Sequence, residues 1–267
     1  IIHQLAIKAY RFQRHLRNIR SQHAVNKGAL LPSIIARHQS LLLKKLGDNN
    51  ENLQQQKVQN LLLASRKVDG IIINPGQTFS YWHSIGKPKS KHGYVNGMLL
   101  SQGNVIAGIG GGLCQLSNLL YWLFLHGPFQ ILERYHHSYD VFPDSGRVLP
   151  FGSGATVFYN YVDLVVKNIS LSPIQLHIWL TDKHLKGQLL SDISQERKFS
   201  VRETNHFFVH WRKQWFRYNE LYRDIKYKGK IENTELITTN FAPVLYKTSK
   251  QKLEANNYSI LEITKVE

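Results

Sequence analysis

The chain carries the stretch Gly108-Ile109-Gly110-Gly111-Gly112-Leu113-Cys114-Gln115-Leu116-Ser117-Asn118-Leu119-Leu120-Tyr121, which holds its only cysteine. Three consecutive glycines are typical of a tight turn or of a close approach between backbones. The apolar spacing that follows predicts a helix. The sequence therefore predicts a glycine turn that leads into a helix, with Cys114 in the first helical turn.

The position of Cys114 suggests two roles. At the start of a helix, unpaired amides and the positive end of the dipole favour an anion, which lowers the pKa of a thiol. Such a thiol could act as a nucleophile. A lone cysteine can equally fill a core as a small apolar side chain. The residues alone leave both roles open.

The charge of the chain favours an anionic partner. Its 34 basic and 18 acidic residues give a net charge of +16, which suits a membrane surface, a wall polymer or nucleic acid. The sequence has no nucleic-acid module, zinc-ligand pattern, phosphate loop or nucleophile elbow. We therefore expect no nucleic-acid partner, no metal and no cofactor.

No signal peptide or apolar stretch long enough to span a bilayer is visible in the sequence. This predicts a protein of the cytoplasm or of the inner membrane face. The chain begins at Ile1, so the loss of a targeting segment stays open, and no pattern indicates an oligomeric state.

Sequence character divides the chain into three regions. Residues 1–54 form a basic, helix-like N-terminal region, whose arginines Arg11 to Arg20 belong either to a membrane-surface helix or to a solvated or packing arm. Residues 55–182 form the central domain, which opens with an amphipathic helix over 55–68 that Gly70 ends. Residues 183–267 form a β-rich C-terminal extension.

From Gly70 onward the pattern favours strands. We expect them at 71–73, 78–82, 105–107, 129–132 and 174–180, with 155–159 and 162–166 as a β pair and turns at 74–77, 96–97 and 228–230. The predicted fold class is α+β, with N-terminal helices followed by a largely antiparallel β domain and one helix carrying the glycine-run cysteine.

A thiol nucleophile needs a base, and histidine is the usual one. His136 and His137 follow the strand after the cysteine helix, and only one of two adjacent strand residues can face Cys114. Arg134 could hold a substrate carboxylate or pair with Glu133 or Asp163. Asp163 lies in an apolar run, where it is either a structural hydrogen-bond centre or the group that orients the histidine.

Four segments carry a resemblance to a known family. They are Asn74-Pro75-Gly76-Gln77-Thr78-Phe79-Ser80, Gly110-Gly111-Gly112-Leu113-Cys114-Gln115-Leu116-Ser117, Glu133-Arg134-Tyr135-His136-His137-Ser138, and Asp163-Leu164 before Lys167-Asn168. Together they span about residues 57 to 169, and in this order they resemble the VanW family. The match selects His137 over His136 as the base.

The resemblance implies a link to glycopeptide resistance and peptidoglycan metabolism. It also implies a cysteine-dependent L,D-transpeptidase, in which Cys114 attacks a stem-peptide carbonyl and His137 acts as base and acid. Amides around Leu113 to Gln115 would stabilise the oxyanion. The residues assigned to substrate binding are Arg134, Gln115, Ser117, Gly111 and Gly112.

Two features of the sequence depart from this prediction, and two alternative functions stay open. Gly154 stands where many members have an acid, and no export signal is visible although transpeptidation occurs outside the membrane. The first alternative is a non-catalytic accessory that binds peptidoglycan precursor or partner resistance proteins at a membrane surface. The second is an amidase or hydrolase that uses the same two residues on a soluble peptide.

Overall fold

A computed structural model describes residues 9–16, 18, 21–43, 51–101, 104–136, 138–141, 143–144 and 148–262. The chain forms two compact units, each built from two separate stretches. Unit 1 contains residues 1–135 and 154–198, and unit 2 contains residues 136–153 and 199–267. The three regions expected from the sequence follow composition rather than packing, and they stay predictions.

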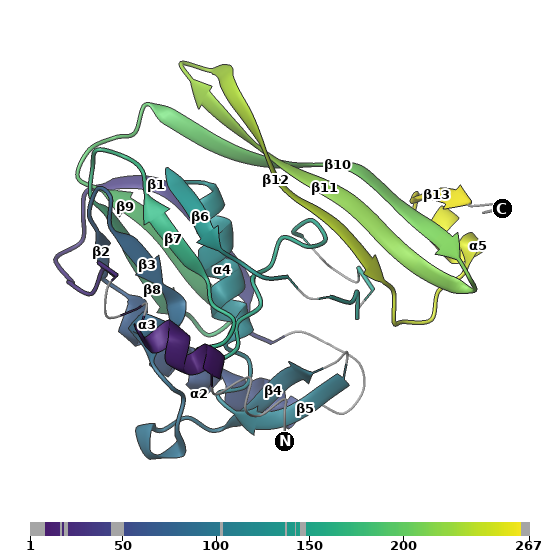
Figure 1. Cartoon of the computed structure of the whole chain (residues 1–267), viewed down its shortest axis with the longest axis horizontal. Helices are drawn as coiled ribbons and strands as arrows, with labels where there is room; N and C mark the ends of the chain where they lie inside the picture. Colours follow the sequence, from purple (N-terminus) through teal and green to yellow (C-terminus); the bar gives the residue numbers. More distant parts are fainter. Residues whose placement is uncertain are drawn as a thin grey trace. The chain divides into compact units, whose positions relative to one another are not determined.

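The larger sheet of unit 1 is antiparallel, with the strand order β1-β9-β8-β2. Its strands are β1 (Ser33–Leu41), β2 (Ile72–Ile73), β8 (Ile174–Leu180) and β9 (His184–Ser191). Helix α2 (Glu51–Val68) packs against β8, and helix α4 (Cys114–Leu125) packs against β1 and β9 (Figure 1). Gly187 of β9 allows this approach, because a Cβ there would lie 2.7 Å from Cδ1 of Leu123.

A second sheet of unit 1 has the order β3-β7-β6 and is also antiparallel. It is formed by β3 (Thr78–Ser80), β6 (Phe129–Glu133) and β7 (Val165–Asn168). Helix α3 (Tyr81–Ile85) follows β3, the 3-10 turn η1 (Ser90–His92) comes next, and β4 (Asn96–Ser101) pairs with β5 (Asn104–Ile109).

Helix α4 joins the two sheets of unit 1 into one core. The ring of Phe124 lies 5.5 Å from that of Phe79 on β3 and 4.8 Å from that of Phe129 on β6. All three side chains are fully buried, and each contributes about 1.5–3 kcal/mol through burial. A helix as rich in apolar residues as α4 is expected to be enclosed in this way, and these contacts fix its C-terminal end.

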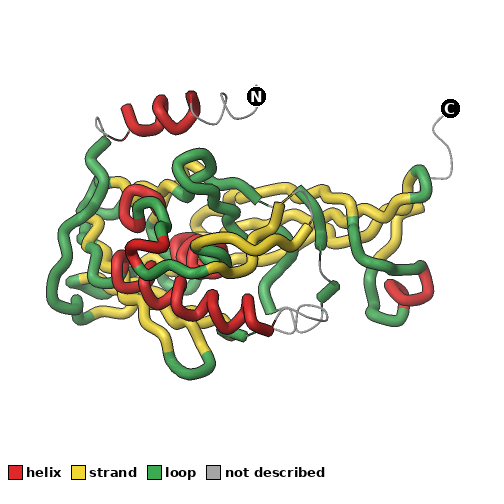
Figure 2. Tube along the Cα trace, turned by 90° about the horizontal axis from the view of Figure 1, so that it is seen from below, coloured by secondary structure: helices red, strands yellow, loops and turns green. Residues whose placement is uncertain are grey.

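Unit 2 is built on three long strands and two short elements (Figures 1 and 2). The order is β12-β11-β10-β13, and the elements are β10 (Arg197–Trp211), β11 (Gln214–Tyr227), β12 (Lys230–Pro243), α5 (Lys250–Glu254) and β13 (Ser259–Glu262). β13 runs parallel to β10. Lys228 and Gly229 join β11 to β12 with φ of 47° and 80°, as a type I′ hairpin turn requires.

A buried arginine explains why residues 136–153 belong to unit 2. Arg217 of β11 donates to Oδ2 of Asp140 (3.2 Å), to Oδ1 of Asp144 (2.8 Å) and to Nε2 of His206 (2.9 Å). Burial opposes the charge on Arg217, but the two carboxylates raise its pKa above the ordinary value. Burial lowers the pKa of His206, and Arg217 lowers it further.

Much of the predicted secondary structure is confirmed. The α+β class holds, the helix over 55–68 is α2, and Gly70 follows it with φ of 82°. The turn at 74–77 forms with Gly76 at φ of 76° and a 3.0 Å bond from the amide of Gln77 to the carbonyl of Asn74. The strand at 174–180 and the hairpin at 228–230 are also present.

Other expectations were wrong. Residues 33–41 form strand β1 rather than helix, because they pair with β9 along their length. Tyr81 and Trp82 begin helix α3 rather than continue a strand, because the hydroxyl of Ser80 caps the helix by accepting from the amide of His83 at 3.1 Å.

Two predicted pairings were wrong as well. Asn96 and Gly97 lie within β4 and pair with β5, so they do not form a turn. Segments 155–159 and 162–166 share only the bridge between Phe158 and Val162, because β7 pairs instead with β3 and β6.

Candidate functional site

The glycine run is shaped by two close backbone approaches. A Cβ on Gly111 would lie 2.0 Å from the carbonyl carbon of Gly97 on β4. Gly112 has φ of 90°, and a Cβ there would lie 2.4 Å from Cβ of Lys57 on α2. Real Cβ atoms do not approach other atoms so closely, so glycine is required at both positions. The first role of Gly111 and Gly112 is therefore to pack the turn against α2 and β4.

Asn60 of α2 holds the glycine run in place. Its Nδ2 donates to the carbonyls of Gly111 (2.9 Å) and Val95 (3.0 Å), while its Oδ1 accepts from the amide of Val95 (2.9 Å). The side chain is fully buried. Sequence reasoning missed this residue, because no local pattern distinguishes it from the other polar residues of the predicted helix.

Cys114 is the first residue of α4, as predicted. Its thiol is partly buried, and Sγ lies 3.9 Å from the carbonyl oxygen of Val157. Burial raises the pKa of Cys114, although hydrogen bonding opposes the rise. This direction is opposite to the lowered pKa expected from the sequence, because the burial of the thiol outweighs the hydrogen bonds that favour its charged form.

The start of α4 offers two amides. The amide of Gln115 donates to the carbonyl of Gly112 at 3.0 Å, and that of Leu116 donates to the carbonyl of Leu113 at 3.1 Å. The amides of Leu113 and Cys114 have no acceptor among the described residues. The amides of Leu113, Cys114 and Gln115 were predicted to bind an oxyanion. The first two make no backbone hydrogen bond among the described residues, whereas the amide of Gln115 already donates to Gly112.

Tyr81 lies close to this turn and was missed by sequence reasoning. Its hydroxyl donates to the carbonyl of Leu113 at 2.8 Å, and its side chain is fully buried. Burial raises the pKa of Tyr81 well above its ordinary value, and the nearby Cys114 adds to the rise. Tyr81 thus remains a neutral donor that fixes the residue preceding Cys114.

Two of the predicted substrate-binding side chains make contacts within unit 1. Nε2 of Gln115 donates to Oγ of Ser40 (2.9 Å) and to the carbonyl of Leu41 (2.7 Å), which ties α4 to the end of β1. Oγ of Ser117 donates to the carbonyl of Ala155 at 2.6 Å and is fully buried. Both contacts position α4, and a substrate role for either residue stays a prediction.

Arg134 is held beside α4. Its Nε donates to the carbonyl of Gly154 at 2.9 Å, and its guanidinium carbon lies 4.9 Å from the ring centre of Tyr121. Burial lowers the pKa of Arg134, and the contact with the ring compensates in part. Arg14, rather than Arg134, forms the ion pairs with Glu133 and Asp163.

Asp163 is a structural hydrogen-bond centre, which was the first of its two predicted roles. Its carboxylate accepts from Oγ of Ser80 (2.6 Å), from the amide of Trp82 (3.0 Å) and from the amide of Leu164 (2.9 Å). Arg14 adds a contact at 3.4 Å. Burial raises the pKa of Asp163, while the bonds from Ser80 and Trp82 oppose the rise.

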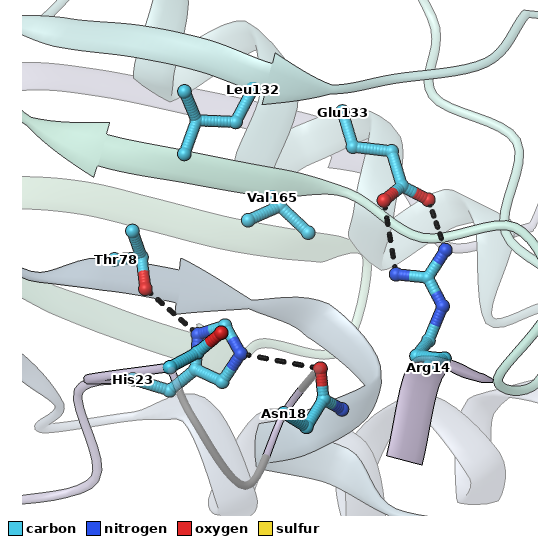
Figure 3. Close-up of a pocket in the computed structure, with 8 residues that line it drawn as sticks. Arg14, Asn18, His23, Thr78, Leu132, Glu133 and Val165 are labelled. Atoms are coloured by element: carbon cyan, nitrogen blue, oxygen red, sulfur yellow. Dashed lines mark hydrogen bonds and ion pairs between the residues drawn. The ribbon is translucent and has the colours of Figure 1, made fainter. Parts of the chain in front are cut away.

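The N-terminal segment packs on the second sheet and encloses a pocket of about 170 Å³ (Figure 3). His23 in this pocket contacts Oγ1 of Thr78 at 2.8 Å and Oδ1 of Asn18 at 3.4 Å. Arg14 is 7% exposed and forms a bidentate pair with Glu133. These contacts support the packing arm, which was the second alternative for the N-terminal region. Arg17 and Arg20 lie outside the described residues.

The predicted base, His137, lies outside the described residues. Its neighbour His136 belongs to unit 2, so neither histidine is placed relative to Cys114. The pairing of Cys114 with His137 stays a prediction. Within the described ranges, no group of three His, Cys, Asp or Glu side chains could hold a metal ion, and no helix has the length and apolar character that a membrane span requires.

The raised pKa of Cys114 gives a direct expectation for its reactivity. Near neutral pH the thiolate fraction is smaller than in a free thiol, so iodoacetamide should alkylate Cys114 several-fold more slowly than a model thiol. The inflection in the pH–rate profile should lie above that of the model thiol. Denatured protein, which restores the ordinary pKa, is the control. An inflection below the model thiol would contradict the burial argument.

Comparisons with known proteins show the family to which the chain belongs. A family model described as VanW like protein matches residues 56–190. The vancomycin B-type resistance protein VanW of Enterococcus faecalis is 30% identical over 195 residues, which cover 72% of this chain and 71% of that protein. The uncharacterized protein YoaR of Bacillus subtilis is 30% identical over 115 residues, 43% of this chain and 36% of that protein. No solved structure matches the chain. The matched span contains the glycine run, Cys114 and Asp163, and the chain belongs to the VanW family.

Proposed function

We propose that this protein acts in glycopeptide resistance as a cysteine-dependent acyl transferase on peptidoglycan stem peptides, in the manner of an L,D-transpeptidase. The observation that carries the proposal is the start of α4. There Cys114 is the first helical residue, and the amides of Leu113 and Cys114 have no acceptor among the described residues. Two such donors next to a thiol suit the oxyanion of an acyl-transfer intermediate.

In the proposed reaction, His137 takes the proton from the Cys114 thiol while the sulfur attacks a stem-peptide carbonyl. The bond from carbon to the leaving amine breaks, His137 returns the proton to that amine, and a thioester remains. An acceptor amine then attacks the thioester, the new amide forms, and the bond between sulfur and carbon breaks to restore the thiol. Because burial raises the pKa of Cys114, a base that takes the thiol proton would assist the attack.

The test is a mass measurement on the purified protein incubated with a stem tetrapeptide and no acceptor amine. The wild-type protein should gain the mass of the acyl group on Cys114, and hydroxylamine should remove it. Cys114→Ala should show no adduct, whereas Asp182→Ala, at an exposed loop position, should retain it. Wild-type protein that stays unmodified would count against acyl transfer. Product release without an acceptor would favour the hydrolase instead.

A second candidate is a non-catalytic accessory that binds peptidoglycan precursor or partner resistance proteins at the inner membrane face. The helical segment 9–16 favours it, because the side chains of Tyr10, Phe12 and Leu16 are exposed in a chain of net charge +16. Exposed apolar side chains on a basic protein suit an anionic membrane surface. The double variant Phe12→Ser and Leu16→Ser should then cosediment less with phosphatidylglycerol vesicles than the wild-type protein does. Equal binding of the wild-type protein and the variant would exclude a membrane role of this segment.

A further inference from the structure

The loop between α3 and β4 carries positive charge that no carboxylate balances. Residues 86–93, which we name the basic loop, read Gly-Lys-Pro-Lys-Ser-Lys-His-Gly, and the side chains of Lys87, Lys89 and Lys91 are exposed. Among the described residues these lysines have no ion pair. The sequence over 70–132 contains no Asp or Glu. Because like charges repel one another, the loop suits a ligand that brings negative charge.

The basic loop is held at both ends. Nζ of Lys67, at the end of α2, donates to the carbonyl of Ile85 at 2.6 Å, immediately before the loop. Gly86 and Gly93 bound the loop with φ of 72° and 84°, a conformation that glycine adopts without strain. The ammonium group of Lys67 therefore lies at the base of the loop, and a surface fixed in this way loses little freedom when a ligand binds.

Two contacts tie the basic loop to the glycine run. Pro88 packs on Gly110, where a Cβ would lie 2.6 Å from Cβ of Pro88. The amide of Gly110 also donates to the carbonyl of Val95, just beyond the loop, at 3.0 Å. The chain from Gly110 to Cys114 spans at most about 14 Å. The basic loop is therefore a neighbour of the first turn of α4.

Tyr159 connects the basic loop to Cys114 by a second route. Nζ of Lys87 lies 6.0 Å from the centre of the Tyr159 ring, and the guanidinium carbon of Arg11 lies 5.8 Å from the same centre. Tyr159 follows closely after Val157, whose carbonyl oxygen lies 3.9 Å from Sγ of Cys114. Cations from two segments far apart in the sequence thus converge on one ring near the thiol.

From this arrangement we infer that the basic loop binds the diphosphate group of a peptidoglycan precursor whose stem peptide reaches Cys114. The inference rests on the proposed acyl transfer for the stem peptide, and it names the form of the substrate. A precursor carries its stem peptide on a sugar diphosphate, whereas the mature wall has lost that group. An extended tetrapeptide spans at most about 14 Å, so one ligand can contact both the loop and the thiol.

The chemistry of the basic loop favours phosphate over other partners. The ammonium group of lysine is a point charge with three donors, which suits a phosphate group, whereas a carboxylate is better matched by the planar fork of arginine. The loop contains no arginine. It also has no exposed apolar side chain, so it lacks the anchors with which a protein surface inserts into a membrane. Nucleoside-linked and lipid-linked precursors share the diphosphate, and the experiment separates them.

The test is a calorimetric titration of the whole chain with the substitution Cys114→Ala, which prevents acyl transfer during the measurement. Two probes carry a diphosphate. One is a stem glycopeptide linked to a nucleoside diphosphate, and the other is the same glycopeptide linked to a short prenyl diphosphate. The third probe is the glycopeptide without phosphate. At least one diphosphate probe should bind about tenfold more tightly than the third, and the probe that does so identifies the source. Equal affinity for all three probes would overturn the inference.

A loop variant and a matched control remove the same amount of charge. Every substitution replaces an exposed lysine by glutamine, so neither variant should lose stability. The loop variant is Lys87→Gln, Lys89→Gln and Lys91→Gln, and the control is Lys183→Gln, Lys198→Gln and Lys230→Gln.

The loop variant should lose about tenfold in affinity for the diphosphate probe and none for the phosphate-free probe, whereas the control should keep both affinities. Added salt should weaken the binding of the diphosphate probe to the control more than to the loop variant. Equal losses in the two variants would indicate an effect of net charge alone and would overturn the inference. A single-stranded oligonucleotide at the same phosphate concentration should not displace the diphosphate probe. Displacement would reassign the loop to nucleic acid.

The outcomes also distinguish this inference from the proposed function. With a diphosphate probe, a thioester on Cys114 that forms as readily in the loop variant as in the wild-type protein would keep acyl transfer and reject the role of the loop. Binding that depends on the loop, without any thioester in the wild-type protein, would keep the diphosphate site and reject acyl transfer.

Discussion

Gly111→Ala is expected to destabilise unit 1 by about 3 kcal/mol or more, beyond the ~1–3 kcal/mol of ordinary overpacking. The added Cβ would lie 2.0 Å from the carbonyl carbon and 2.1 Å from the carbonyl oxygen of Gly97. Both are backbone atoms of a paired strand, so neither can move aside as a side chain would. The hydrogen bond from Asn60 to the carbonyl of Gly111 would be strained as well. Guanidinium denaturation followed by circular dichroism measures the loss.

Gly28→Ala is the matched control for this substitution. Its Cβ would also come close to another atom, at 2.8 Å, but that atom is Cδ1 of Ile72, the flexible end of a side chain. We therefore expect a loss below about 1 kcal/mol. Gly97→Ala, whose Cβ would lie 2.5 Å from the oxygen of Gly111, should resemble Gly111→Ala. Equal stability of the Gly111 and Gly28 variants would show that the turn does not require this backbone approach.

Asp163→Ala should cost about 3–5 kcal/mol of unfolding free energy, the range for breaking a buried ion pair. The carboxylate is fully buried and bonded to Ser80, Trp82 and Leu164. Its loss would leave the buried Arg14 with Glu133 alone and would remove the acceptor of two backbone amides. The cap of α3 would weaken too, since Ser80 is held by Asp163 while it caps that helix.

Asp182→Ala, at an exposed loop position, is the control and should stay within about 0.5 kcal/mol of the wild-type protein. Arg14→Met should also be destabilising, because it leaves two carboxylates close together. The double variant should then lose less than the sum of the two single losses. Strict additivity, or a cost for Asp163→Ala as small as that for Asp182→Ala, would refute the central role of this carboxylate.

The local signals in the sequence were sufficient for some elements only. The helix at Cys114 and the turn at 74–77 could be predicted because glycine, proline and apolar spacing act within a few residues. Strand β1 (33–41) could not, because its conformation depends on pairing with β9, far along the chain. The aromatic residues Tyr81 and Trp82 favoured a strand, but they form a helix because Ser80 caps its N-terminus.

The candidate site shows the same limit. The position of Cys114 was predictable, but its pKa was not. The field at a helix start contributes about 0.3–1 kcal/mol, whereas burial can shift a pKa by several units at about 1.4 kcal/mol each. Burial is set by tertiary packing that no local pattern reveals. Asn60 was missed for this reason, since it is one polar residue among several on its helix.

The pairing of β1 with β9 has a consequence for the order of folding during synthesis. β1 lies near the beginning of the chain and bonds a strand at 184–191, and Arg14 bonds a carboxylate 149 residues away. Neither contact can form until almost all of unit 1 has left the ribosome, roughly ten seconds or more after β1 at usual elongation rates. Nascent chains should therefore keep the N-terminal segment sensitive to protease until β9 emerges, and such high contact order predicts slow refolding.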